Sequence, residues 1–154
     1  LPMATVRPDP HSPGTVTLAL PADPRLIRVV RLAVSGLAAE LGFNLDEIED
    51  LKLAIGEACT DRLEHAPGAT LTVRLSYGDG ELTAEVAGDG PDVGGAGEVG
   101  EDDPSGFALA LVEALTDRVE REVDGAGITV LRMTKSAAGA LADGGPGGPG
   151  PGME

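Results

Sequence analysis

The chain has 154 residues and a formal net charge of −15, and aromatic residues make up only 2% of it. This length is typical of one domain with one hydrophobic core. The acidic balance and the few aromatic side chains argue against a surface that tracks phosphates or stacks on bases, so we expect no direct contact with nucleic acid. The charge favours a basic protein partner, although acidity can also serve solubility alone.

The sequence shows no sign of a membrane span or of secretion. No segment approaches the roughly 18 apolar residues of a membrane span, and residues 1–7 lack the apolar core of a signal peptide. A single cysteine, Cys59, excludes an internal disulfide and suits a reducing compartment. Because Cys59 falls between apolar helix positions, we expect a buried, unreactive thiol in a cytoplasmic protein.

The first half of the chain predicts one strand and two helices. Residues 1–14 contain four prolines and are expected to form a flexible arm. Alternating polar and apolar residues over 15–20 predict a strand. Apolar residues at helical spacing over 24–41 predict a helix. A capping-box pattern at Asn44 opens a second helix, which ends before Pro67.

The second half predicts two hairpins separated by a long loop and a short helix. Residues 88–105 are rich in Gly, Pro and acidic residues, and a loop of this length predicts a lid. A helix is expected over 106–116, and a disordered Gly- and Pro-rich tail over 136–154. Four strands are expected here, over 70–77, 81–87, 117–123 and 127–134. This order predicts a two-layer α/β sandwich, with helices on one face of a mixed, mostly antiparallel sheet.

Two carboxylates, Glu57 and Asp61, lie one helical turn apart on the second predicted helix. Residues four apart on a helix are neighbours, so like charges there repel each other. Such a pair can coordinate a cation or activate a hydroxyl. It can equally belong to a solvated acidic face that includes Glu64. The residue pattern alone leaves both interpretations open.

The order of elements and several short motifs resemble the GHKL (Bergerat-fold) ATPase superfamily, and within it the anti-sigma factor and serine-protein kinase branch. The resemblance implies an ATPase-like domain over residues 15–135. Its most specific part is the helix segment 50–61, where the family places a Glu as general base and, four residues later, an Asn that holds Mg²⁺. Glu57 matches the base, and Asp61 stands at the Asn position.

The second family motif is Asp-x-Gly-x-Gly, which follows the strand before the lid and whose Asp binds the adenine amino group. In this chain Gly88 stands at the Asp position, Gly90 at the middle Gly and Asp92 at the last Gly. Gly88 removes the hydrogen bond that identifies adenine. The altered motif therefore predicts weakened nucleotide binding.

Two further motifs carry the remaining candidate cofactor-binding residues. The family's Gly-x-Gly at the end of the lid has Gly106 and Ala108 at its two glycine positions, and the Thr of its Gly-Thr motif corresponds to Thr129, displaced by one position. Ala108 adds a methyl group where backbone amides should approach phosphate. Asp61 can still ligate Mg²⁺, since carboxylate oxygens suit that ion.

The charge pattern also bears on nucleotide binding. Between Arg74 and Arg118 the chain has no Lys or Arg but eleven Asp and Glu residues. A lid of this charge would repel ATP, which is a polyanion. The sequence therefore predicts weak or lost binding of Mg-ATP.

The resemblance implies transcription regulation by partner switching. In the family an Arg on the first helix contacts both the sigma factor and its antagonist. Arg28 and Arg31 are the candidates here, unless they belong to a solvated helix face. The first hypothesis is a homodimeric anti-sigma factor that sequesters an alternative sigma factor and is released by an anti-anti-sigma (STAS-domain) partner. The second is an active serine kinase that uses Glu57 as base, and the third is an orphan interaction module with this fold.

Overall fold

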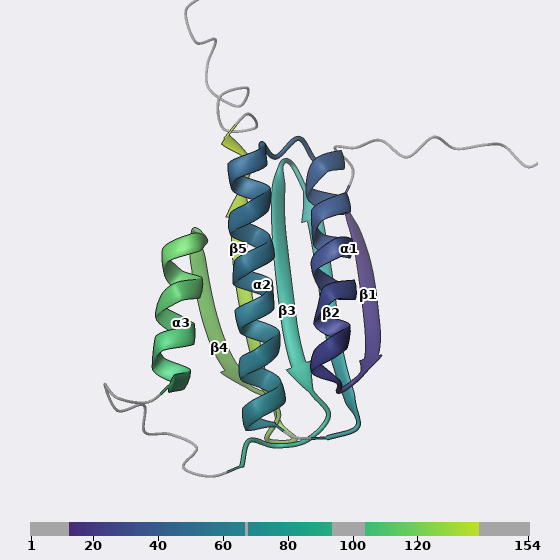
Figure 1. The fold of residues 1–154 in the computed structure, drawn as a ribbon, viewed down its shortest axis with the longest axis vertical. Helices are drawn as coiled ribbons and strands as arrows, with labels where there is room; N and C mark the ends of the chain where they lie inside the picture. The colour runs from purple at the N-terminus through teal and green to yellow at the C-terminus, as the bar shows by residue number, and fades with distance from the viewer. Residues whose placement is uncertain (1–12, 67, 94–103, 139–154) are drawn as a thin grey trace, which may run out of the picture.

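The computed structural model of the chain describes residues 13–66, 68–93 and 104–138. Most of the expected arm, lid and tail therefore lies outside the described residues. The described elements form two layers, with helices packed on one face of a sheet (Figure 1). None of the helices in these ranges is long and apolar enough to cross a membrane.

A five-stranded sheet forms one layer. Its strands lie in the order β1 (Gly14–Pro21), β2 (Thr70–Gly78), β3 (Glu81–Gly88), β5 (Thr129–Ser136) and β4 (Arg118–Val123). Every strand pair in the described ranges is antiparallel, so the parallel pairing implied by a mixed sheet is not found there. Positive φ angles at the turn between β2 and β3 close the hairpin that the Gly-Asp-Gly pattern predicts.

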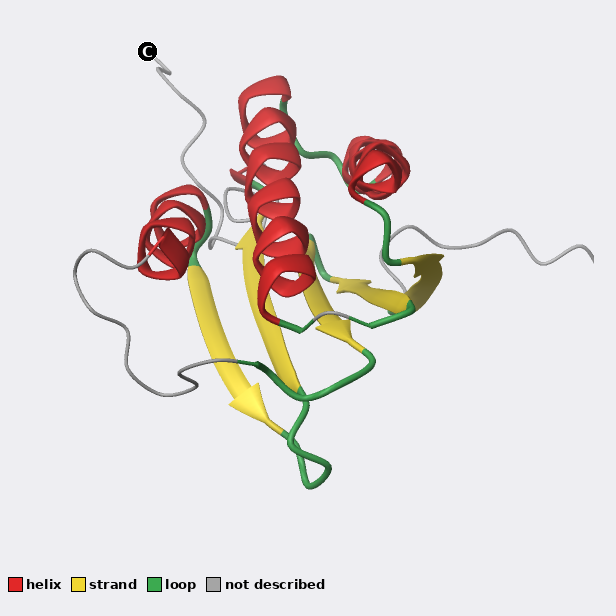
Figure 2. Ribbon diagram, turned by 60° about the horizontal axis from the view of Figure 1, so that its bottom comes forward, coloured by secondary structure: helices red, strands yellow, loops and turns green. Residues whose placement is uncertain are grey.

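Three helices form the other layer, all on the same face of the sheet (Figure 2). They are α1 (Ile27–Glu40), which follows a 3-10 turn, α2 (Leu45–His65) and α3 (Pro104–Leu115). The predicted capping box opens α2: the Asn44 side chain accepts from the backbone N–H of Glu47, whose carboxylate accepts from the Asn44 N–H, both at 2.8 Å. The predicted two-layer α/β sandwich is confirmed.

Several element ends differ from the sequence-based expectation. β3 includes Gly88 and α3 begins at Pro104, so both ends of the segment 88–105, which was expected to form a lid, lie in regular elements. β5 continues to Ser136, which pairs with Glu81 of β3. The following residue, Ala137, is buried against the core. The packed domain thus extends slightly beyond residue 135.

The hydrophobic core lies between the helix layer and the sheet. It is built almost entirely from aliphatic side chains, and Cys59 lies within it, fully buried. Helix α2 contributes most to this core from the helix layer, but two of its buried residues are charged, Asp61 and Arg62. Both lie near the C-terminal end of α2, where β3 also ends (Figure 1). That end of the molecule contains the candidate site.

Candidate functional site

Arg62 lies on the buried side of α2, and only 1% of its side chain is exposed. It follows Cys59 by three residues and Ile55 by seven, a spacing that places all three on the face toward the core. Its guanidinium donates to Asp61 Oδ2, from Nε at 3.0 Å and from Nη2 at 2.7 Å. It also donates from Nη1 to Asp92 Oδ1 at 2.7 Å. The buried positive charge is therefore balanced by two carboxylates.

Asp92 links helix α2 to the far strands of the sheet. It accepts a second charged hydrogen bond from Arg121 Nη2, at 2.8 Å, and Thr129 also helps to lower the pKa of its carboxyl. Burial raises the pKa of Asp92, but the hydrogen bond and charge of Arg62 lower it more, so it lies below the usual range. The carboxylate is therefore ionised at neutral pH. We call Asp61, Arg62, Asp92 and Arg121 the ion cluster.

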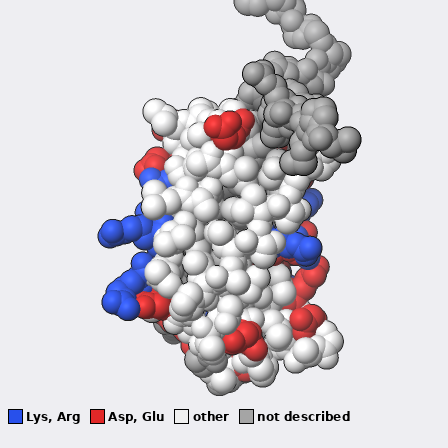
Figure 3. Space-filling view, turned by 90° about the vertical axis from the view of Figure 1, so that its right-hand side faces the viewer, with Lys and Arg blue, Asp and Glu red and all other residues white. Residues whose placement is uncertain are grey.

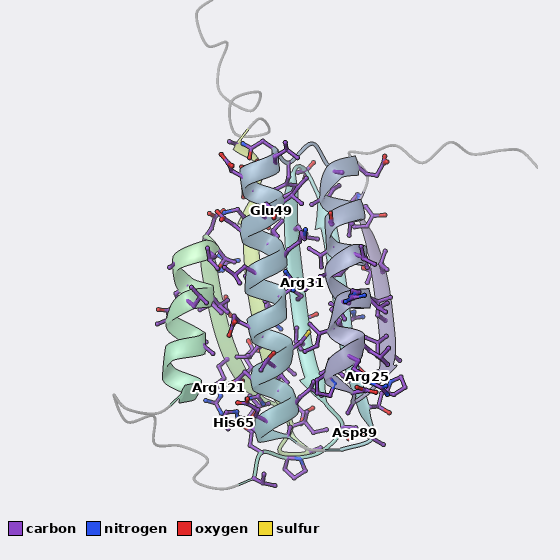
Figure 4. All side chains as sticks on the ribbon, viewed as in Figure 1. Arg25, Arg31, Glu49, His65, Asp89 and Arg121 are labelled. Atoms are coloured by element: carbon purple, nitrogen blue, oxygen red, sulfur yellow. The ribbon has the colours of Figure 1, made fainter. Side chains whose placement is uncertain are left out.

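The turn that follows β3 is held against the end of α2 by further bonds. The backbone N–H of Val93 donates to the carbonyl oxygen of His65 at 2.8 Å. Asp89 Oδ2 accepts from the N–H groups of residues 69 and 70 at 3.2 and 3.0 Å. Figure 4 shows His65, Asp89 and Arg121 at this end of the molecule. The turn is thus fixed on both sides by hydrogen bonds within this chain.

Asp61, the predicted metal ligand, already pairs with other side chains of this chain. Its Oδ2 accepts both hydrogen bonds from Arg62, and its Oδ1 lies 3.3 Å from Nδ1 of His65. A Mg²⁺ ion at Asp61 would sit beside the guanidinium of Arg62, whose positive charge would repel it. Among the described residues, no group of three His, Cys, Asp or Glu side chains is placed to hold a metal. The side chains around Asp61 therefore do not fit Mg²⁺.

The positions that correspond to the adenine motif are also occupied by protein atoms. Gly88, at the end of β3, faces Ala66, and an added Cβ there would lie 2.8 Å from the Ala66 carbonyl oxygen. The Asp that the family has at this position would therefore clash with Ala66. Gly90 lies in the turn beyond β3. These residues do not fit an adenine base held in the family's manner.

The remaining candidates divide between two elements. Gly106 and Ala108 lie in the first turns of α3. Thr129 begins β5, is 3% exposed and helps to lower the pKa of the Asp92 carboxyl in the ion cluster. Arg62 is not among the residues predicted from the sequence, although an Arg at a core position of a helix signals a buried carboxylate partner.

Glu57, the predicted base, lies apart from the ion cluster, in a groove between α1 and α2. The groove has a volume of about 630 Å³, and its lining includes Arg28, Arg31, Leu32 and Leu53. Figure 4 shows Arg31 between the two helices, and Figure 3 shows positive side chains projecting along one border of the molecule. In the described part of the chain, Arg25 forms an ion pair with Asp23, whereas neither Arg28 nor Arg31 forms one.

Comparison with known proteins agrees with this architecture. The model of the histidine kinase-like ATPase domain, HATPase_c_2, matches residues 20–135. The serine-protein kinase RsbW of Halalkalibacterium halodurans is 32% identical over 81% of this chain and 85% of its own length. RsbW of Bacillus subtilis is 33% identical over 83% of this chain and 89% of its own length.

A solved structure shows the same fold. The RsbU and RsbW domains of a Mycobacterium tuberculosis protein match with a TM-score of 0.62 at 24% identity, over 80% of this chain and 32% of that longer chain. The element order, the helix bearing Glu57 and the sequence relatives agree with one another. The chain therefore belongs to the histidine kinase-like ATPase domain family of the GHKL superfamily, in its RsbW-like serine-protein kinase branch.

Proposed function

We propose that this protein is an anti-sigma factor that sequesters an alternative RNA polymerase sigma factor and is released by an anti-anti-sigma partner with a STAS domain. The RsbW relatives support a role in partner switching. Sequestration is a binding event, so it does not depend on phosphate transfer. The observation that carries the proposal is the positively charged groove between α1 and α2 on a chain with a net charge of −15.

This groove has the composition of a protein-binding surface. Arg28 and Arg31 line it beside two apolar side chains, Leu32, which is 65% exposed, and Leu53, which is 43% exposed. Protein interfaces combine apolar contacts with charged groups that fix orientation and partner choice. A partner segment that enters this groove is expected to carry carboxylates. The acidic remainder of the surface suits the basic regions of a sigma factor.

Weak or lost nucleotide binding is part of the proposal. Members of this family are named for an ATPase domain, and the resemblance implies that Mg-ATP would be held by Asp61 and by the motif around Gly88. Asp61 is paired with Arg62, and the space beside Gly88 is taken by Ala66. Partner switching in this protein would then depend on the affinities between the proteins alone, and not on phosphate transfer.

An active serine kinase is the second candidate, and Glu57 is the residue that favours it. Its side chain is half-buried and lines the groove in which we expect a partner to dock. A general base must lie within hydrogen-bond reach of the hydroxyl that it deprotonates, and a partner serine in the groove would satisfy this requirement. The kinase also needs bound Mg-ATP, which the ion cluster opposes.

We further propose that the protein acts in the cytoplasm as a homodimer, without direct contact with membrane or nucleic acid. The mass of one chain is 15.5 kDa. Light scattering coupled to size-exclusion chromatography should therefore give twice this mass. A monomer that still binds a sigma factor would remove the dimer from the proposal without affecting sequestration.

The decisive experiment uses the purified chain with each alternative sigma factor and each STAS-domain protein of its host, produced one at a time. We expect at least one sigma factor to bind without nucleotide, and a STAS protein to displace it. Intact-mass measurement after incubation with Mg-ATP should show no phosphate on the STAS protein. Phosphate there would support the kinase, and a folded protein that binds none of the sigma factors would support the orphan module.

A further inference from the structure

The ion cluster contains two of the positions at which this chain departs from the family motifs. Asp61 stands where the family has its metal-holding Asn, and Asp92 stands where the adenine motif has its last Gly. The two positions are far apart in sequence, but Arg62 donates to both side chains, at 2.7 Å in each case. The two altered positions therefore lie close together in space and form one site of paired charges.

The charges of this site are balanced within the protein. Two carboxylates face two guanidiniums, and the side chains of Asp61, Arg62 and Asp92 are 8%, 1% and 6% exposed. Buried charges are tolerated only when they are paired and hydrogen-bonded. No described buried side-chain oxygen or nitrogen lacks a hydrogen-bond partner. The site needs no bound cation to satisfy its carboxylates.

We infer that Arg62 is a built-in cation, which takes the place that the family motifs assign to Mg²⁺ and holds the turn after β3 against α2 and β4 without any ligand. The turn is anchored by Asp92 to Arg62 and Arg121, and by the N–H of Val93 to His65. This inference deepens the nucleotide part of the proposed function. It rests on the ion cluster and on family membership, and not on the identity of the partner.

Arg62→Met tests the cation directly, because methionine keeps much of the side-chain volume and removes the charge. Two buried carboxylates are then left without their main partner, and we expect the thermal midpoint to fall by about 10 °C or more. The matched control is Arg132→Met. Arg132 also bridges two carboxylates, those of Glu85 and Glu122, but on the open face of the sheet. We expect the thermal midpoint of Arg132→Met to fall by at most about 3 °C.

A compensated variant keeps the test valid if Arg62→Met does not fold. Asp61→Asn/Arg62→Met/Asp92→Asn leaves no uncompensated buried charge, and well-packed neutral replacements of buried ion pairs are often tolerated. We expect it to fold and to recover at least half of the midpoint lost in the single variant. An Arg62→Met midpoint within the range of the control would overturn the inference. A triple variant that is no more stable than the single one would do the same.

Nucleotide binding is the second readout, measured on the unaltered chain. Calorimetric titration with Mg-ATP to millimolar concentration should give no binding heat, and the hydrogen exchange of the Val93 amide should be slow and unchanged by Mg-ATP. Binding in the micromolar range, or slower exchange at Val93 when Mg-ATP is added, would overturn the inference. Neither measurement involves a sigma factor, so a failure of the proposed partner would remain distinguishable from a failure here.

Discussion

Gly88, the last residue of β3, lies directly against Ala66, the residue that caps the C-terminus of α2. A Cβ placed on Gly88 would be 2.8 Å from the carbonyl oxygen of Ala66 and 2.9 Å from its Cβ. Both distances are shorter than carbon atoms tolerate without a shift of the backbone. The end of α2 therefore closes over the end of β3, and glycine at position 88 is a packing requirement of this chain.

Gly88→Ala should consequently destabilise the protein, although alanine is the smallest possible replacement. Overpacking of this kind costs about 1–3 kcal/mol. The matched control is Gly36→Ala, since Gly36 lies in α1 with no atom within 4 Å of an added Cβ. Replacing a helical Gly by Ala should stabilise the protein by up to about 1 kcal/mol. Urea unfolding of both variants measures the difference, and equal effects at the two sites would contradict the packing seen here.

Asp92 makes the stability of the protein sensitive to acid. Its pKa in the folded protein lies below the usual 3.8, because the hydrogen bond and charge of Arg62, with help from Thr129 and Arg121, outweigh the effect of burial. A depressed carboxyl pKa contributes stability above the unfolded pKa, and this contribution is lost as the pH falls through the folded value. Asp92→Asn should therefore cost about 2 kcal/mol at neutral pH.

The difference between Asp92→Asn and the unaltered chain should shrink below about pH 4, where the unfolded form of the unaltered chain takes up a proton at Asp92 more readily than the folded form does. Unfolding by urea at several pH values between about 3 and about 7 measures this convergence. Glu64→Gln is a suitable control, since Glu64 is exposed on the same helix. A difference that stayed constant across this range would mean that charge is not the reason for the loss.

Cys59 should be inert in the folded protein. Burial raises the pKa of its thiol to about 12, and none of its surface is exposed. A thiol reagent at about pH 8 needs both access and thiolate, so it should react only after the protein is unfolded in denaturant. Thr60→Cys provides an exposed thiol one position further along α2 and should react at once. Fast reaction of Cys59 itself would show that α2 opens from the core under native conditions.

The sequence allowed the regular elements to be predicted well, because their signals are local. The alternation over 15–20 and the capping box at Asn44 depend only on neighbouring residues, and the strands and helices formed where these patterns indicated. The ion cluster could not be predicted in this way. Asp92 is thirty residues from Arg62 along the chain, and it meets Arg62 only because β3 ends beside the C-terminus of α2.

The candidate base illustrates a second limit of sequence patterns. Glu57 and Asp61 are one helical turn apart, a spacing at which two carboxylates can act together, but Asp61 pairs with Arg62 in the ion cluster, whereas Glu57 lines the groove that Arg31 also lines. A spacing of four residues offsets two side chains by about 40° around a helix. At the edge of a buried face this offset is enough to give one residue a buried environment and the other a half-exposed one.

Arg31 is the residue whose charge should decide partner binding. It lies in the groove without an ion pair among the described residues, so its positive charge is available to a carboxylate of a partner. Arg31→Glu would place like charges against each other, and we expect the affinity for the partner to fall at least tenfold. Biolayer interferometry with whichever sigma factor or STAS protein binds the unaltered chain measures this change.

Arg74→Glu supplies the matched control for charge reversal. Arg74 is exposed on β2, and its nearest carboxylate oxygen, on Glu85, is 4.0 Å away. Both variants change the net charge by the same amount, so a general effect of added negative charge would weaken binding equally in the two. A selective loss in Arg31→Glu, with thermal midpoints that differ by only a few degrees, would place the partner on the groove between α1 and α2. Equal losses, or no loss in Arg31→Glu, would mean that partners bind elsewhere on the molecule.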